Sequence, residues 1–132
     1  MVSIFVPNST HSINDSTDIL LEVFRWAFRR IVCSSLGESA GEAVIFFIKE
    51  TLRRDPIEVL WENPRAVYDE MVRLFGEGTK ILISILILNI NREYGLSMDP
   101  EYFLELMCNG GQSAINEIRS FIESVAKARG GR

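Results

Sequence analysis

The segment from Phe75 to Lys80, FGEGTK, contains the residue types of a phosphate-binding loop. Such a loop requires two glycines separated by four residues, the second followed by Lys and Ser or Thr, directly after a strand. Here the two glycines are only two positions apart, the segment follows a helical pattern, and Glu77 would bring negative charge to a bound anion. The spacing therefore favours a structural role, in which Gly76 and Gly78 link two helices and adopt positive φ without strain.

The other reactive side chains do not predict a catalytic or metal site. His11 is the only histidine, and such sites need several converging ligands. The acid pairs Asp69 with Glu70 and Glu101 with Glu105 are typical of solvated helix faces, unless a cleft shifts their pKa values. We therefore expect a protein without enzymatic activity, cofactor or metal.

The segment from Arg25 to Arg30, RWAFRR, mixes arginine with aromatic residues, as nucleic-acid-binding surfaces often do. Glu22 and Asp18 lie one and two turns before Arg25 on the same helix face, so they can form ion pairs within the helix. The net charge of -4 and the pI near 5.0 also oppose binding to nucleic acid or to an anionic membrane. A DNA-associated regulator is therefore the weakest of the functions considered.

Six helices are predicted from hydrophobic periodicity and from residues that start or stop helices. They cover approximately residues 15–34, 35–54, 63–76, 79–94, 99–109 and 112–128. Asn63-Pro64 and Asp99-Pro100 each place a capping side chain before a proline at the first helical position. Residues 1–14 are polar and rich in turn formers, which predicts a flexible arm before a helical domain at 15–129.

The helix expected at 35–54 begins at a capping box formed by Ser35 and Glu38. Asp55-Pro56 ends it, because proline disfavours helical geometry in the preceding residue. The residues predicted to face the core are Ala40, Ala43, Val44, Phe47, Ile48 and Leu52.

The apolar run from Ile81 to Ile90 could be a membrane anchor, a buried strand or a core helix. It is ten residues long, whereas a helix needs about twenty residues to cross a bilayer. The segment continues without a breaker from Thr79 to Tyr94, which is helix length rather than strand length. Its polar residues form only a thin stripe, so we predict a nearly surrounded helix at 79–94 in the centre of an all-α bundle.

A single domain is the expectation from 132 residues, of which 47% are hydrophobic and 24% charged. A chain of this size can bury about two-thirds of its unfolded surface without covalent or metal crosslinks. Cys33 and Cys108 lie in no metal or redox motif. The sequence leaves undecided whether they form a disulfide, and buried thiols in a reducing compartment are the preferred interpretation. The first residues lack the basic region and the apolar length of a signal peptide, which predicts a cytoplasmic protein.

Two short stretches, SLGES and LFGEGTKILISILILNINREYGL, resemble a small archaeal all-helical family of unknown function. That family is similar to the Nitrosopumilus-type output domain of archaeal signalling proteins. The matching positions are Leu36, Gly37, Glu38, Ser39, Phe75, Gly76, Gly78, Lys80, Gly95 and Leu96, within residues 36–96. The resemblance implies an all-helical signalling or regulatory module without catalytic residues. Residues 44–50, VIFFIKE, are more apolar than that family's pattern, so the partner need not be the same.

These observations predict a non-enzymatic regulatory or protein-interaction module that acts as a homodimer with an unidentified protein partner. On the helix at 15–34, the residues opposite the polar stripe should enter the core. One flank beside them, Leu21, Phe28 and Val32, is continuous and apolar. A single domain of this size has little left to cover that flank, so we predict that it forms the dimer interface.

The alternative is a small-molecule-binding protein or an enzyme with a pocket between helices. Such a pocket would be lined by Trp26, Trp61, Tyr68 and Tyr102. Aromatic residues at helical spacing are more often part of a core than of a pocket, so this alternative stays second.

Overall fold

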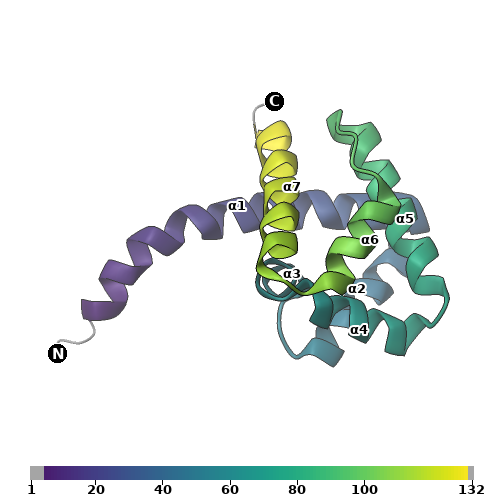
Figure 1. Cartoon of the computed structure of the whole chain (residues 1–132), viewed down its shortest axis with the longest axis horizontal. Coiled ribbons are helices and arrows are strands. Elements are labelled where there is room, and N and C mark those ends of the chain that lie inside the picture. The colour runs from purple at the N-terminus through teal and green to yellow at the C-terminus, as the bar shows by residue number, and fades with distance from the viewer. Residues whose placement is uncertain (1–4, 131–132) are drawn as a thin grey trace.

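Seven α-helices make up the part of the chain that the computed structural model describes (Figure 1). It describes the backbone of residues 5–130 and the side chains of residues 16–130. The helices are α1 (Phe5–Leu36), α2 (Glu38–Leu52), α3 (Pro56–Glu62), α4 (Pro64–Phe75), α5 (Gly78–Tyr94), α6 (Pro100–Asn109) and α7 (Gln112–Gly130). No strand occurs in this range, so the predicted all-α single-domain bundle is confirmed, with one helix more than expected.

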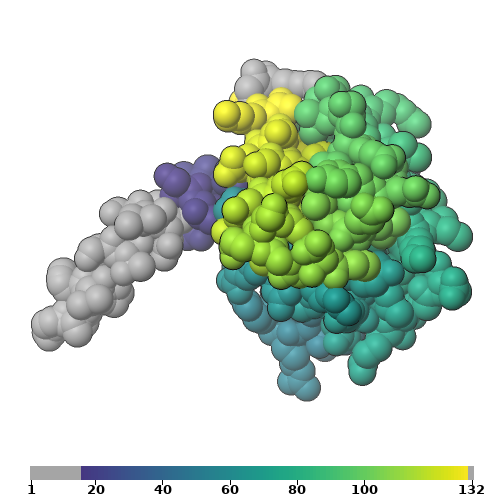
Figure 2. Space-filling view, in the orientation of Figure 1, coloured from purple at the N-terminus to yellow at the C-terminus, as the bar shows by residue number. Residues whose placement is uncertain are grey.

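The long helix α1 is the framework on which the other helices pack. It lies against α2, α5 and α7 and also contacts α3. Figure 1 shows α7 crossing α1, while the first turns of α1 extend beyond the other helices. In Figure 2 the face turned to the viewer is formed mainly by α6 and α7, in green and yellow. Among the described side chains of α1, burial accordingly begins only at Leu21.

The segment predicted as a flexible arm is helical from Phe5 onwards. Pro7 does not prevent this, because the first amides of a helix have no acceptor within it and a proline there loses no hydrogen bond. The backbone of residues 5–14 is therefore continuous with α1, and the flexibility of the predicted arm stays a prediction. Residues 1–4 of the predicted arm lie outside the described residues.

Two predicted helix starts are confirmed by their capping side chains. The Asn63 side chain accepts a hydrogen bond from the Ala66 amide at 3.4 Å, and Asp99 accepts one from the Tyr102 amide at 3.1 Å. A proline follows each cap at the first helical position. These starts could be predicted because they depend only on neighbouring residues.

The helix missing from the prediction is α3. The Asp55 carboxylate accepts a hydrogen bond from the Glu58 amide at 3.3 Å, and Pro56 is the first helical residue. α2 has already ended at Leu52, where Arg53 follows in the left-handed conformation with φ of 60°. Asp55-Pro56 therefore starts a helix, rather than only ending the one before it.

The predicted capping box at Ser35 and Glu38 does not form. α1 continues to Leu36, and α2 begins after Gly37 without a capping side chain. Gly37 has φ of 95°, a conformation that glycine accepts without steric cost, so this residue makes the turn. The Ser35 hydroxyl instead accepts a hydrogen bond from Asn89 Nδ2 at 2.6 Å, which joins α1 to α5.

The FGEGTK segment links α4 to α5, as predicted, but with a different role for its second glycine. Gly76 has φ of 55° and turns the chain. Glu77 then has helical dihedral angles, and Gly78 is the first residue of α5. The prediction of positive φ at Gly78 is therefore wrong, because one reversed residue is enough for this link.

The helix predicted at 79–94 is confirmed as α5, but it is not surrounded by other helices. It contacts α1, α4, α6 and α7 with one side. Its other side exposes Ile81, Ile85 and Leu88. Three side chains of α7, Ile118, Ile122 and Val125, have no exposed surface. Among residues 5–130, no helix has both the length and the apolar character that crossing a bilayer requires.

Candidate functional site

The predicted dimer interface on α1 lies mostly inside the domain. Leu21 and Val32 are buried, and Phe28 is partly buried against the core. Leu21 and Val32 therefore cannot contact a second copy, so the predicted interface is wrong for these two residues, and the contact predicted for Phe28 stays a prediction. Helices α5 and α7, which come later in the chain, pack against α1. The periodicity of α1 alone does not contain that information.

The predicted aromatic pocket is not assembled, because its four members lie in separate environments. Trp26 is exposed at the surface, with the Arg129 guanidinium 3.8 Å from its ring centroid. Trp61 faces the Arg119 guanidinium at 4.9 Å, and Arg119 Nε donates to the Trp61 carbonyl at 2.9 Å. Each tryptophan thus holds an arginine from α7, a contact that stabilises the packing of α7.

The two tyrosines of the predicted pocket also make separate contacts. The Tyr102 hydroxyl donates a hydrogen bond to the Glu117 carboxylate at 2.6 Å, and this bond raises the pKa of Tyr102. Tyr68 lies beside Cys108, where burial raises the pKa of its phenol. Both phenols therefore stay protonated at neutral pH.

The arginines of RWAFRR are bound to carboxylates from other helices. The pairs are Arg25 with Asp55, Arg29 with Glu42, and Arg30 with Glu93. Two nitrogens of Arg25 donate to one Asp55 oxygen, at 2.6 and 3.0 Å, and this hydrogen bonding raises the pKa of Arg25. The predicted pair between Glu22 and Arg25 also forms, at 3.8 Å. These contacts fasten α1 to its neighbours and leave little charge available for a phosphate.

The acids Asp69 and Glu70 pair with arginines of their own helix, as the interpretation of a helix face predicts. Arg65 lies 3.5 Å from Asp69, and Arg73 lies 3.2 Å from Glu70. Glu101 and Glu105 are exposed on α6. The side chain of His11 lies outside the described residues.

One cluster of possible metal ligands joins the end of α1 to the start of α2. The ligand atoms of Cys33, Glu38 and Glu42 all lie within 4.8 Å of one another. Burial raises the pKa of the Cys33 thiol, and the Glu42 carboxylate is already bound to Arg29. A protonated thiol and an occupied carboxylate are poor ligands, so the cluster favours an ion pair over a metal ion. Cys33 and Cys108 are not joined to each other.

An apolar face of α2 is turned away from the rest of the chain. Ala40, Ala43, Phe46 and Phe47 are exposed there, although Ala40, Ala43 and Phe47 are predicted to face the core. The phenyl rings are 55% and 52% exposed and contact each other edge to face, with centroids 5.6 Å apart. We call these four residues the α2 face. A second, separate set, Ile81, Ile85 and Leu88, forms the α5 face.

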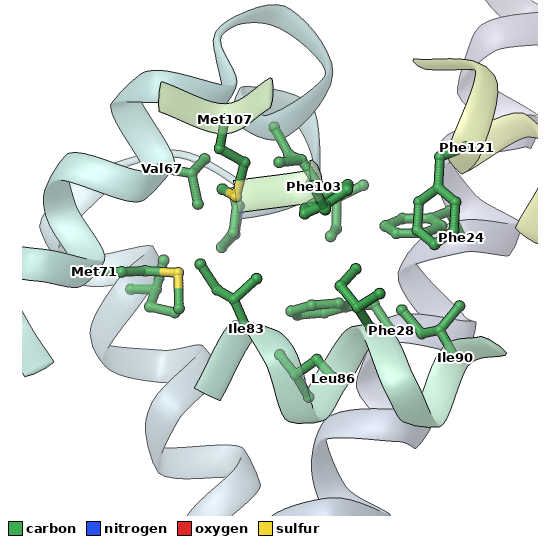
Figure 3. Close-up of a pocket in the computed structure, with 15 residues that line it drawn as sticks. Phe24, Phe28, Val67, Met71, Ile83, Leu86, Ile90, Phe103, Met107 and Phe121 are labelled. Atoms are coloured by element: carbon green, nitrogen blue, oxygen red, sulfur yellow. The ribbon is translucent and has the colours of Figure 1, made fainter. Parts of the chain in front are cut away.

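Behind α2 lies an internal cavity of about 60 Å³ to which all seven helices contribute. Figure 3 shows Met71, Ile83, Phe103 and Met107 pointing into a common space from α4, α5 and α6. Ile48 of α2 also lines this cavity. None of the four aromatic residues predicted for a pocket is among its lining residues.

Sequence reasoning missed both the α2 face and the cavity. One signal for the face was present, because consecutive residues of a helix point about 100° apart, so Phe46 and Phe47 widen the apolar arc of α2 beyond a single core face. No comparable signal for the cavity exists, since its residues come from across the chain. In comparisons with protein-family models, with curated proteins and with solved structures, no match to this chain was found.

Proposed function

We propose that this chain is a non-enzymatic helical interaction module of a regulatory system, and that it acts as a homodimer through the α2 face. The observation that carries the proposal is the exposure of two adjacent phenylalanines, Phe46 and Phe47, on an outward helix face. Exposed apolar patches mark interaction sites, and aromatic residues are enriched in the centres of interfaces. The ion pairs that occupy the arginines of α1 support a structural role for them, rather than a catalytic one.

The α2 face is complementary to itself when two copies pair in opposite directions. Its first half carries the small residues Ala40 and Ala43, and its second half carries Phe46 and Phe47. Antiparallel pairing about a twofold axis places the rings of one copy over the alanines of the other. A closed twofold dimer of this kind is the commonest homo-oligomer.

Charges beside the α2 face suit the same arrangement. Glu38 lies at the start of α2, while Lys49 and Arg53 lie at its end, on the same flank of the helix. All three are exposed, and none takes part in an ion pair within the described residues. In an antiparallel pair, Glu38 of one copy meets Lys49 and Arg53 of the other.

Light scattering after size-exclusion chromatography tests the proposal. We expect the wild type to have about 30 kDa, twice the 15.0 kDa of the chain. Phe47→Glu should give a folded monomer, since the side chain lies outside the core. Leu88→Glu is the matched control, because Leu88 of the α5 face is 53% exposed and should leave the dimer intact.

Charge exchange adds a second criterion. Glu38→Lys should weaken the dimer, and adding Lys49→Glu should restore it by reversing the pair. A wild type that stays monomeric at high concentration, or a Phe47→Glu variant that still dimerises, would contradict the proposal. A dimer that is lost only in Leu88→Glu would assign self-association to the α5 face instead.

In the same proposal, the α5 face is available to bind a partner protein. Ile81, Ile85 and Leu88 follow one another at helical spacing and form an apolar stripe flanked by Lys80 and Arg92. The resemblance of residues 36–96 to the archaeal family similar to the Nitrosopumilus-type output domain supports a role in signalling. The proposed location is the cytoplasm, and the two separate cysteine thiols suit a reducing compartment.

A further inference from the structure

The cavity in the core has a lining that disfavours water. Its fifteen lining residues are aliphatic, aromatic, proline or methionine, without a polar side chain among them. A buried water molecule needs two to four hydrogen-bonding partners, which this lining does not supply. A space of about 60 Å³ is large for a close-packed interior, where few voids exceed the size of a water molecule. The cavity is therefore suited to an apolar guest.

Its walls can adapt to the size of that guest. Met71 of α4 and Met107 of α6 reach into the space from different sides (Figure 3). Methionine is unbranched and has three rotatable side-chain bonds, so it can change its conformation without movement of the backbone. The cavity can therefore enlarge beyond its present volume while the helices stay in place.

An opening of the cavity would lie beside Phe28. Fourteen of the fifteen lining residues are buried, and Phe28 of α1 is the one that is partly exposed. Its ring stacks on that of Phe24, with centroids 6.2 Å apart. Rotation of the Phe28 side chain would thus connect the cavity with solvent.

We propose that this cavity is a binding site for a small, neutral, apolar molecule of a few carbon atoms or a single aromatic ring. A carboxylate, phosphate or sugar would lose its hydration there without gaining a hydrogen bond, so these classes are excluded. The site is independent of the pairing through the α2 face, because its residues lie on the inner side of the helices.

Xenon and benzene serve as probes, because an engineered apolar cavity of about 150 Å³ in another protein binds both. The measurements are the thermal unfolding of the full chain and the methyl NMR signals of the lining isoleucines, with and without each probe. We expect at least one probe to raise the Tm of the wild type and to shift the methyl signals of Ile83 and Ile87. No change in Tm or methyl signals with either probe overturns the proposal.

A cavity-filling variant and its matched control distinguish probe binding in the cavity from unspecific binding. Val67→Ile adds a methylene group at a lining position of α4 and should weaken probe binding at least about tenfold. Val72→Ile makes the same change on the same helix, at a side chain that is 39% exposed and outside the cavity, and should bind like the wild type. Equal affinity of the two variants overturns the proposal.

If Val67→Ile does not fold, Ile83→Val supplies the comparison, because it removes a methylene group from the lining. Ile83→Val should bind benzene more tightly than the wild type. An affinity equal to or weaker than that of the wild type overturns the proposal.

Discussion

Replacing Gly41 by alanine should separate α1 from α2, because the two helices meet most closely at this residue. A Cβ atom on Gly41 would lie 2.8 Å from the Cα atom of Cys33 and 2.9 Å from its Sγ atom. The Sγ atom could rotate away, but the Cα atom belongs to the backbone of α1 and cannot. Gly41→Ala therefore forces one helix to shift away from the other.

The size of this effect follows from two opposing contributions. Adding a methyl group to a tightly packed contact typically costs about 1–3 kcal/mol of unfolding free energy. Alanine is better than glycine within a helix by about 1 kcal/mol, which offsets part of that cost. We expect Gly41→Ala to lower the unfolding free energy by about 1 kcal/mol. Gly78→Ala is the matched control: its Cβ would meet no atom within 4 Å at the start of α5, so it should be neutral or slightly stabilising.

Urea denaturation followed by far-ultraviolet circular dichroism measures both variants. The protein concentration must be the same throughout, because the proposed dimerisation would contribute to the apparent stability. A Gly41→Ala variant that is as stable as Gly78→Ala would refute the close packing of α1 on α2 at Cys33. The outward orientation of the α2 face would then require another explanation, since this packing determines which side of α2 points outwards.

Two further predictions concern a buried hydroxyl and an ion pair. The Thr79 side chain is fully buried, and its hydroxyl has no hydrogen-bonding partner within the described part of the chain. Thr79→Val should therefore raise the unfolding free energy by about 1 kcal/mol, and a lower unfolding free energy in urea denaturation would contradict this. Arg54 donates two hydrogen bonds of 3.0 Å to the Glu62 carboxylate, which lowers the pKa of Glu62. This stabilisation is fully present above the pKa that Glu62 has in the unfolded chain. It is lost as the pH falls through the lower pKa that Glu62 has in the folded protein. Arg54→Met should therefore destabilise the protein at neutral pH and not in strong acid. An equal decrease in unfolding free energy at both pH values would assign another role to Arg54.

The features predicted correctly from the sequence are those determined by a few neighbouring residues. Asn63-Pro64 and Asp99-Pro100 start helices because the cap and the proline act on the same turn. Gly95 ends α5 with φ of 68°, as its position after a long periodic segment predicts. The uninterrupted length of residues 79–94 also identified a helix despite its β-branched isoleucines.

The features that could not be predicted depend on distant parts of the chain. Whether Leu21 and Val32 are covered is determined by the helices that pack on α1, which periodicity in α1 does not reveal. The Ser35 hydroxyl bonds to Asn89, more than fifty residues away, instead of capping its neighbour. The cavity likewise needs seven helices in place before it exists, so no single segment indicates it.

The error about α2 and the proposed dimer have the same physical origin. A helix that is apolar on one side shows by its periodicity which side faces the core, whereas α2 has a wide apolar arc with Ile48 towards one edge and Phe47 towards the other. Both sides satisfy the pattern of a core face, so the sequence cannot distinguish them. The fold buries Ile48 and leaves Phe47 half-exposed. A helix with two apolar sides is expected where both are covered, and its own chain covers only one side of α2. In the proposed dimer, a second copy of α2, with small residues opposite the rings, supplies the missing cover.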